Sequence, residues 1–484
     1  RQNYKFFLFQ KLNKYFNNHT MNSQEFSELL LKNFKFKPTS DQKAAIIKLS
    51  EFLSNKSNIS LFLLKGYAGT GKTSLMKTLV ENIHFKKMHV CLLAPTGRAA
   101  KVLSKYSGKK ASTIHKKIYY SKIDKSGKFQ TKLKINKVKN TLFIVDEASM
   151  ISDFSNSSDL FDNKSILKDI FSYVDFKTNS KLIFLGDTAQ LPPVKQTISP
   201  ALNSTFIKES YNIDSEEYEI NDVVRQAEES GILINATSIR NNISNNFIDF
   251  KFDNFSDIEF LSDGFDIQEA IESSYSLNGS ENSIIIVRSN KRANQYNQQI
   301  RKTILAHENK VCVGDLLMIT KNNYFWTSPD SEIPFLANGD IVQILEIFSF
   351  KDIYGFEFAE LKIKMVDYTD QPTFDTVIIL NTLDLDTPSL SYEQSNLLYH
   401  EVQNDYAKIK SKYQRFLKTK ENPFFNALQV KFSYAITCHK AQGGQWPVVF
   451  IEKPYLKDGP NIDYFRWLYT AVTRAESKLY LIGF

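Results

Sequence analysis

Residues 59–73 have the sequence ISLFLLKGYAGTGKT, and this stretch decides the fold. Its first half, 59–65, is a short apolar run typical of a buried β-strand. Its second half, 66–73, has the GxxxxGK[ST] spacing, and a helix-compatible run follows over 74–82. This strand–loop–helix order is the context that a phosphate-binding loop requires. We therefore expect an α/β fold with a parallel sheet flanked by helices.

The loop residues have the chemistry to hold the phosphates of ATP. Glycines let the backbone wrap so that its N–H groups point at the β-phosphate, and the helix that follows adds the dipole of its N-terminus. Lys72 is expected to reach the β- and γ-phosphate oxygens, and Thr73 to ligate Mg²⁺. The predicted nucleotide-binding residues of the loop are Gly66, Ala68, Gly69, Thr70, Gly71, Lys72, Thr73 and Ser74.

Two further apolar strands end in polar residues of the kind that ATP hydrolysis needs. The run 141–145 precedes Asp146 and Glu147, which we expect to hold the Mg²⁺ shell and to polarise the attacking water, respectively. The run 181–185 leads to Gln190, whose neutral amide can sense the γ-phosphate. Parallel strands present their carboxyl ends at one edge, so these side chains are expected to meet. Adjacent acids at a strand end can also be a solvated loop, but the upstream phosphate loop favours the catalytic interpretation.

Charge is distributed unevenly along the 484 residues. The net charge is +8, but residues 101–140 hold thirteen lysines and one acid, whereas residues 201–280 hold sixteen acids and four basic residues. A lysine block of this density can bind phosphates, and it can equally be a solvated basic hairpin. The charge pattern alone leaves both interpretations open.

Composition excludes several classes of protein. With 42% hydrophobic and 24% charged residues, the chain is neither collagen-like, fully disordered nor membrane-embedded. Its three cysteines form no CxxC pair and its seven histidines show no paired metal spacing, so we expect a reducing compartment and neither disulfides nor a zinc site. No signal peptide is predicted in residues 1–20, and Met21 could be a natural start. We expect a cytoplasmic, nucleoid-associated protein with no membrane segment.

Further motifs occur along the chain in a fixed order. Together with the phosphate loop they resemble one family, the superfamily 1 nucleic-acid helicases of the RecD-like and Dda-like branch. The segments that carry this resemblance are Ala94–Ala100, Thr113–His115, Asp146–Ser149, Gly186–Gln190, Val224–Gln226, Tyr434–Gly443 and Leu468–Ala475.

The resemblance implies an ATP-dependent DNA helicase that moves 5′ to 3′ along single-stranded DNA, as a monomer, with roles in replication, recombination or repair. It implies that Gln42 reads the adenine edge and that Gln442 and Gly443 belong to the ATP site. It also implies that Arg225 and Arg474 reach the γ-phosphate from a second motor lobe as the cleft closes. The single-stranded DNA contacts that it implies are Pro95, Thr96, Thr113, His115, Thr437 and His439.

The resemblance also implies a division into two RecA-like lobes with one insertion in each. An SH3-like β-barrel is expected in the second insertion, where apolar residues alternate between glycine turns, followed by a helical arm over 391–420. The expected division is an N-terminal extension over 1–34, a first lobe over 35–115 and 141–205, a basic β-hairpin over 116–140, a second lobe over 206–305 and 428–484, and the barrel with its arm over 306–427.

The basic hairpin falls where the family carries a wedge that separates the duplex at a junction. Such a wedge acts through an aromatic tip, because an aromatic ring can stack on the last base pair. Phe129 is the first candidate, and Tyr119 and Tyr120 are others; an aromatic residue that merely packs against its own lobe is equally consistent. Two other functions stay open: an RNA or RNA–DNA helicase, and a translocase that displaces proteins without unwinding. Protein partners cannot be predicted.

Overall fold

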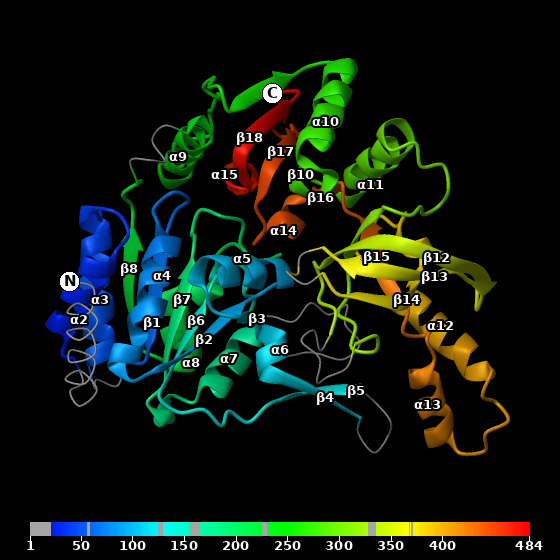
Figure 1. Ribbon diagram of the computed structural model, residues 1–484, viewed down its shortest axis with the longest axis horizontal. Helices are drawn as coiled ribbons and strands as arrows, with labels where there is room; N and C mark the ends of the chain where they lie inside the picture. Colours follow the sequence, from blue (N-terminus) through cyan, green and yellow to red (C-terminus); the bar gives the residue numbers. More distant parts are fainter. Residues whose placement is uncertain are drawn as a thin grey trace, which may run out of the picture.

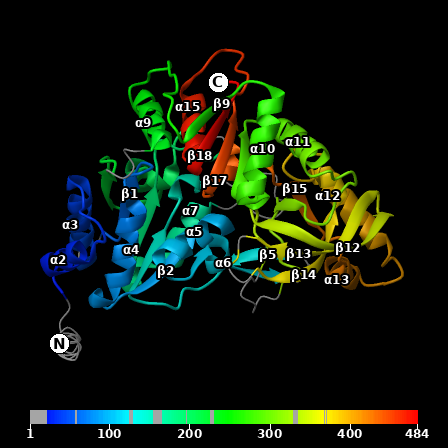
Figure 2. The same cartoon turned by 45° about the horizontal axis from the view of Figure 1, so that its top comes forward.

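The computed structural model describes residues 21–55, 59–123, 129–153, 165–194, 196–224, 230–327, 335–366, 368 and 371–484. They form two parallel β-sheets, a closed β-barrel and a two-stranded hairpin. Figure 1 shows the first sheet at the left, the second at the top and the barrel at the right, and Figure 2 shows the same arrangement tilted. No helix within these described stretches is long and apolar enough to cross a bilayer.

The first sheet has six parallel strands in the order β3-β2-β6-β7-β1-β8. Alternate residues of the interior strand β1 enter two separate cores: Phe62 and Leu64 enter one, and Leu61 and Leu63 enter the other. Both faces are therefore covered by helices, as in doubly wound folds. The strands are β1 (Leu61–Gly66), β2 (His89–Ala94), β3 (Ala111–Thr113), β6 (Thr141–Val145), β7 (Lys181–Gly186) and β8 (Ser215–Ile220).

Side-chain caps fix where the helices of this lobe begin. Thr39 and Asn22 each form a capping box, in which the cap side chain and the third helical residue satisfy each other's backbone N–H groups. Thr96 and Thr113 cap the helices that follow two of the strands. The helices are α2 (Ser23–Asn33), α3 (Ser40–Ser54), α4 (Lys72–Asn82), α5 (Gly97–Ser107), α6 (Ile114–Ile118), α7 (Ile166–Val174) and α8 (Ser204–Tyr211).

The second sheet has five parallel strands in the order β16-β10-β17-β18-β9. Its strands are β9 (Ile258–Leu261), β10 (Ser283–Val287), β16 (Ala435–Thr437), β17 (Trp446–Glu452) and β18 (Ala475–Ile482). Its helices are α9 (Gly231–Ser244), α10 (Gly264–Asn278), α11 (Asn290–Gln299), α14 (Cys438–Ala441) and α15 (Ile462–Val472). The expected pair of parallel-sheet lobes is therefore confirmed.

The predicted barrel is also confirmed: β11, β12, β13, β14 and β15 close into one. Two helices then form the expected arm, α12 (Tyr392–Asn404) and α13 (Lys412–Glu421). The barrel strands are β11 (Leu316–Ile319), β12 (Ile341–Ile353), β13 (Phe356–Met365), β14 (Thr373–Ile379) and β15 (Leu428–Phe432). The basic insertion of the first lobe contains an antiparallel hairpin of β4 (Tyr119–Ile123) and β5 (Phe129–Leu133).

Two expected domain boundaries differ from the structure. Strand β8 was assigned to the second lobe by the division at residue 205, but it pairs with β1 as the edge strand of the first sheet. Its register aligns Leu61 with Ser215 and Gly66 with Ile220. Strand β15 was assigned to the second lobe, but it closes the barrel against β11 and β14. The second lobe therefore begins after residue 224 and resumes after residue 432.

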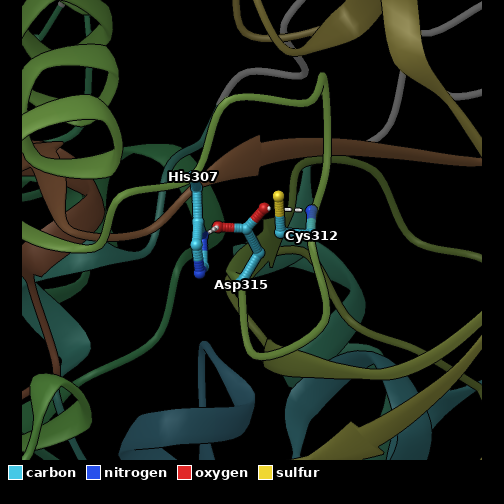
Figure 3. A group of neighbouring side chains, drawn as sticks. All are labelled: His307, Cys312 and Asp315. Atoms are coloured by element: carbon cyan, nitrogen blue, oxygen red, sulfur yellow. Dashed lines mark hydrogen bonds and ion pairs between the residues drawn. The ribbon is translucent and has the colours of Figure 1, made fainter.

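A buried ion-pair network attaches the barrel to the second lobe. Asp315, at the start of the barrel, accepts hydrogen bonds from Arg301 at 3.0 Å, from His307 at 2.9 Å and from the Tyr434 hydroxyl at 3.1 Å. Figure 3 shows His307, Cys312 and Asp315 converging. These three offer ligand types for a metal, but the Arg301 guanidinium is paired with the Asp315 carboxylate, so the group is a structural network.

Candidate active site

The phosphate loop connects β1 to α4 with two glycines in the left-handed region. Gly69 has φ 76° and Gly71 has φ 79°, conformations that favour glycine. Gly71 also lies against Gln42, since a Cβ there would approach the Gln42 Nε2 to 2.4 Å. The Lys72 ammonium group donates to the carbonyl oxygens of Gly66 and Tyr67. The loop thus has the predicted compact geometry.

Lys72 lies in a site that contains three acids. Burial lowers the pKa of Lys72, and the nearby Asp187, Glu147 and Asp146 carboxylates oppose that shift. A lysine ammonium with carboxylates on one side and backbone N–H groups on the other is suited to bind a polyanion together with a cation.

Gln42 is buried beside the loop. Its Nε2 donates to the Thr70 carbonyl at 2.9 Å, and its Oε1 accepts from the Thr39 backbone N–H at 3.1 Å. The side chain therefore ties helix α3 to the phosphate loop. Its reading of adenine stays a prediction.

The two predicted carboxylates follow β6, whose neighbours in the sheet are β2 and β7. Asp146 accepts hydrogen bonds from the Glu147 backbone N–H at 2.9 Å and from the hydroxyl of Tyr106 on α5. Burial and the Asp146 charge raise the pKa of Tyr106, so this phenol stays a hydrogen-bond donor. Helix α5 follows the Pro95–Thr96 motif, so Tyr106 connects a predicted DNA-contact segment with a predicted Mg²⁺ ligand.

Glu147 faces the second lobe. Its backbone is left-handed, with φ 51°. The Glu147 Oε1 lies 3.9 Å from Nη1 of Arg474, which belongs to the turn after α15. Burial raises the pKa of Glu147, and the charge of Arg474 opposes this shift. A carboxylate with a raised pKa can accept a proton from water, which suits the predicted role.

Arg474 is held in place by its own lobe. Its guanidinium donates to the Thr470 carbonyl at 3.0 Å, to the Gly444 carbonyl at 3.1 Å and to the Thr473 hydroxyl at 3.1 Å. The side chain is 4% exposed. The second lobe therefore presents a positioned cation to the catalytic edge of the first.

Tyr469 is the most direct connection between the two lobes. Its hydroxyl donates to Asp187 Oδ2 at 2.6 Å and accepts from the backbone N–H of Ala68 in the phosphate loop at 2.9 Å. Burial and the Asp187 charge raise its pKa well above the ordinary value. One phenol on α15 thus contacts both the phosphate loop and the segment after β7.

The segment 186–194 makes three more hydrogen bonds to the second lobe. The Thr188 carbonyl accepts from Arg466 at 2.6 Å. The Leu191 N–H donates to Thr470 at 2.8 Å, and the Leu191 carbonyl accepts from Gln442 at 2.7 Å. The segment is therefore hydrogen-bonded to α15 and to the turn that contains Gln442.

Gln190 and the candidate Mg²⁺ ligands fit their predicted roles. The Gln190 Oε1 is buried and has no hydrogen-bond partner within the described chain. Thr73 and Asp146 offer hydroxyl and carboxylate oxygens, the ligand atoms that Mg²⁺ prefers. The residues present thus fit a magnesium nucleotide.

The predicted DNA-contact residues fall into two groups. Thr96 caps α5, and Gly443 of the second lobe packs against it: a Cβ at Gly443 would lie 3.3 Å from Thr96 Oγ1. Thr437 ends β16, and the exposed His439 lies in α14, which follows it in the second lobe. Pro95 precedes Thr96 at the end of β2. Thr96 therefore lies at a contact between the lobes, and the contacts of all four residues with DNA stay predictions.

Thr113 and His115 lie at the start of α6, which leads into the hairpin. Thr113 is buried as a helix cap that accepts from the Lys116 N–H at 3.3 Å, so its side chain has a structural role here. The His115 ring lies 5.6 Å from the ring of Tyr119. Their contacts with DNA stay predictions.

Two predicted residues fall where the structure says nothing of their side chains. Arg225 lies outside the described residues, although the preceding Val224 donates its N–H to the Gly69 carbonyl at 3.1 Å. Of Phe129 only the backbone is described. Among the other wedge candidates, the Tyr119 hydroxyl donates to Asp169 at 2.7 Å and packs on its own lobe, whereas Tyr120 is 44% exposed.

Sequence reasoning missed the two tyrosines that complete the site, Tyr106 and Tyr469. Tyr469 lies inside a recognised motif, so its position was available, but its two partners are about 280 and 400 residues away in the chain. A third missed contact places the guanidinium of Arg240 4.4 Å from the ring centre of Tyr67. Only the packed lobes reveal these contacts.

Comparisons with known proteins agree with this geometry. A model of an AAA domain matches residues 39–254, and a model of a UvrD-like helicase C-terminal domain matches residues 432–482. The chain is 26% identical to the ATP-dependent DNA helicase dda of Enterobacteria phage T4 over 87% of this chain and 93% of that protein. It is 29% identical to the ATP-dependent RecD2 DNA helicase of Deinococcus radiodurans over 32% of this chain and 19% of that protein.

A solved structure of Pif1 helicase from Bacteroides, in complex with ADP-AlF3 and ssDNA, aligns over 92% of both chains at 15% identity, with a TM-score of 0.46. The motifs in their order, the two sheets and the two family matches lead to one assignment. The family models and the helicase relatives together support a superfamily 1 helicase of the type that includes the RecD-like and Dda-like proteins.

Proposed function

We propose that this protein is an ATP-dependent DNA helicase that translocates along single-stranded DNA and separates duplex ahead of it. The observation that carries this proposal is the contact of the two lobes at the phosphate loop. Arg474 approaches Glu147, and Tyr469 bridges Ala68 and Asp187. A site assembled from both lobes can hydrolyse ATP only when they close, which is how hydrolysis can drive movement.

This geometry supports the following proposed roles of the residues in ATP hydrolysis. Lys72 and the loop N–H groups would bind the β- and γ-phosphates, and Thr73 and Asp146 would hold Mg²⁺, which would supply positive charge beside the phosphate oxygens. Glu147 accepts the proton of the attacking water. Arg474 stabilises the charge that develops on the γ-phosphate, and Arg225 is the second candidate for this role. Gln190, whose buried amide oxygen has no hydrogen-bond partner among the described residues, is the proposed sensor of the γ-phosphate.

The proposed DNA contacts come from both lobes. Thr96 of the first lobe lies against Gly443 of the second, and Thr437 and His439 precede Gly443 in the chain. Phosphate contacts from the two lobes would be made and released out of phase as the cleft opens and closes, which gives sequence-independent tracking. The 5′-to-3′ direction and action as a monomer are part of the proposal.

ATPase assays test the proposal against its RNA alternative. We expect single-stranded DNA to stimulate ATP hydrolysis and RNA of the same sequence to stimulate it much less, with Lys72→Ala inactive in both. Equal stimulation by RNA would overturn the assignment of DNA as substrate.

An unwinding assay tests the translocase alternative. The native protein is expected to separate a tailed duplex, with ATPase activity and strand separation lost together in Lys72→Ala. DNA-stimulated hydrolysis with displacement of a bound protein block but no strand separation would identify a translocase instead.

A further inference from the structure

The helical arm carries a segment of concentrated positive charge that the motor does not use. Residues 406–420 contain six basic residues and no acid. The basic residues are Lys408, Lys410, Lys412, Arg415, Lys418 and Lys420. The acids of the arm lie outside this segment, on α12 or at its ends.

Three of these lysines are available to a ligand. Lys408, Lys410 and Lys412 are exposed, and none of them forms an ion pair with a described residue. By contrast, Lys418 is paired with Glu421 at 2.8 Å. Lys408 and Lys410 lie in the turn that joins α12 to α13, and Lys412 is the first residue of α13, so three exposed cations occur within five residues.

The rest of the segment adds buried positive charge and aromatic surface. The Lys420 ammonium lies 4.4 Å from the ring centre of Phe425, and burial together with the neighbouring Lys321 lowers its pKa to about 8. The Arg415 Nε is buried without a hydrogen-bond partner among the described residues. Tyr413 is 45% exposed. Like charges crowded together repel one another, and a polyanion relieves this repulsion.

The arm is held in place by packing against the barrel and by side-chain hydrogen bonds. Phe358, Leu398 and Val402 are buried in a shared core between the barrel and the arm. The turn is fixed by hydrogen bonds from Asn422 to the Tyr406 hydroxyl and from the Tyr354 hydroxyl to Asp405. Residues held this way lose little freedom on binding, so their charges can contribute to affinity.

The position of the arm suggests what occupies it. Figures 1 and 2 both place the hairpin strand β5 and α13 beside the barrel, away from the junction of the two lobes. The single strand is expected at that junction. DNA that lies beyond the hairpin has not yet been separated and is still double-stranded.

We propose that the basic turn and α13 form a binding surface for the phosphate backbone of duplex DNA ahead of the hairpin, with Lys408, Lys410 and Lys412 as its main contacts. This inference rests on the proposed helicase function and adds a second DNA site to it. Such a surface would hold the duplex against the hairpin while the lobes pull the single strand.

Binding assays with matched variants test this surface. The triple variant Lys408→Gln, Lys410→Gln, Lys412→Gln is compared with a control that loses the same charge on the far side of the first lobe, Lys32→Gln, Lys35→Gln, Lys37→Gln. Fluorescence anisotropy at several salt concentrations measures binding to a single strand and to the same strand carrying a duplex. A third variant with arginine at 408, 410 and 412 keeps the charge.

We expect the arm variant to bind the tailed duplex at least about tenfold more weakly than the native protein, and its salt slope to fall by about 2 to 3, since each phosphate contact contributes about 0.9. Binding of the single strand and DNA-stimulated ATPase activity should be unchanged. The control and the arginine variant should resemble the native protein.

Other outcomes overturn the inference in distinguishable ways. Equal duplex binding by the arm variant and the native protein removes the site, and an equal loss for the single strand assigns the arm to that strand. A loss seen only when a fork carries the displaced tail assigns it to the displaced strand. Absence of DNA-stimulated ATPase activity in the native protein would instead contradict the proposed function.

Discussion

The two lobes have similar sheets but contribute to the site in different ways. The first lobe places its chemistry at the ends of neighbouring strands, where Lys72, Asp146 and Gln190 follow β1, β6 and β7. The second lobe contributes through helix α15 and the turns around it, where Tyr469 and Arg474 lie. In the proposed mechanism the first lobe binds the nucleotide, and the side chains of the second lobe complete the site when the cleft closes. Variants of each lobe should separate these roles.

The largest effect is expected in the first lobe. Lys72→Ala should lower the ATPase rate by about 10³-fold or more, because the lysine is the main protein cation on the transferred phosphates. Binding of single-stranded DNA without nucleotide should persist. A variant that keeps more than about a tenth of the native rate would show that the phosphate loop is not the hydrolysis site.

Arg474→Lys should have the next largest effect, about 10²- to 10³-fold on kcat with little change in KM, since a lysine cannot reproduce the guanidinium fork. A suitable control is Arg292→Lys, which alters an ion pair with Glu452 on the same lobe outside the site. If the two variants had the same kcat, the second lobe would not take part in the chemistry.

Two tyrosines offer a matched comparison between the lobes. Tyr469→Phe removes a hydrogen bond across the cleft and Tyr106→Phe removes one within the first lobe, each to a carboxylate, so each should cost about tenfold. Tyr469→Phe should lower kcat and weaken stimulation by DNA. Tyr106→Phe should raise the Mg²⁺ concentration needed for half-maximal activity. If both variants changed kcat, DNA stimulation and the Mg²⁺ requirement in the same way, the two lobes would not have the separate roles proposed for them.

The smallest effect is expected in the pH profile. Burial raises the pKa of Glu147, so the ATPase rate should fall on the acid side at a pH above the ordinary glutamate pKa of about 4.3. The Arg474 charge opposes that shift. The residual activity of Arg474→Gln should therefore decline at a higher pH than that of the native protein, as measured by kcat between pH 5 and 8. A decline at the same or a lower pH would show that the Arg474 charge does not lower the pKa of the group that limits the rate.

The first lobe was predictable because its signals are local. A strand, a glycine loop and a helix start follow one another within residues 59–82, and the carboxylates directly follow a strand. The barrel was predictable from its alternating apolar residues. These patterns depend on neighbours in the chain, so they can be read in order.

The contacts that could not be predicted depend on packing between distant segments. Strand β8 has acids at three of its six positions and pairs at the edge of the first sheet, so its sequence shows no buried-strand pattern. The role of Tyr469 could not be predicted because its hydrogen-bond partners, Ala68 and Asp187, lie in the other lobe. The position of the three exposed lysines of the arm depends on how the arm packs on the barrel, which the sequence does not show.

The central claim is that hydrolysis between the two lobes drives strand separation by a motor that enters from a 5′ single-stranded tail. Its most direct test is single-turnover unwinding of one duplex with either a 5′ or a 3′ overhang, with Lys72→Ala as the inactive control. The account predicts ATP-dependent unwinding from the 5′ overhang and none from the 3′ overhang. Unwinding only from the 3′ overhang, or equal unwinding by Lys72→Ala, would contradict it.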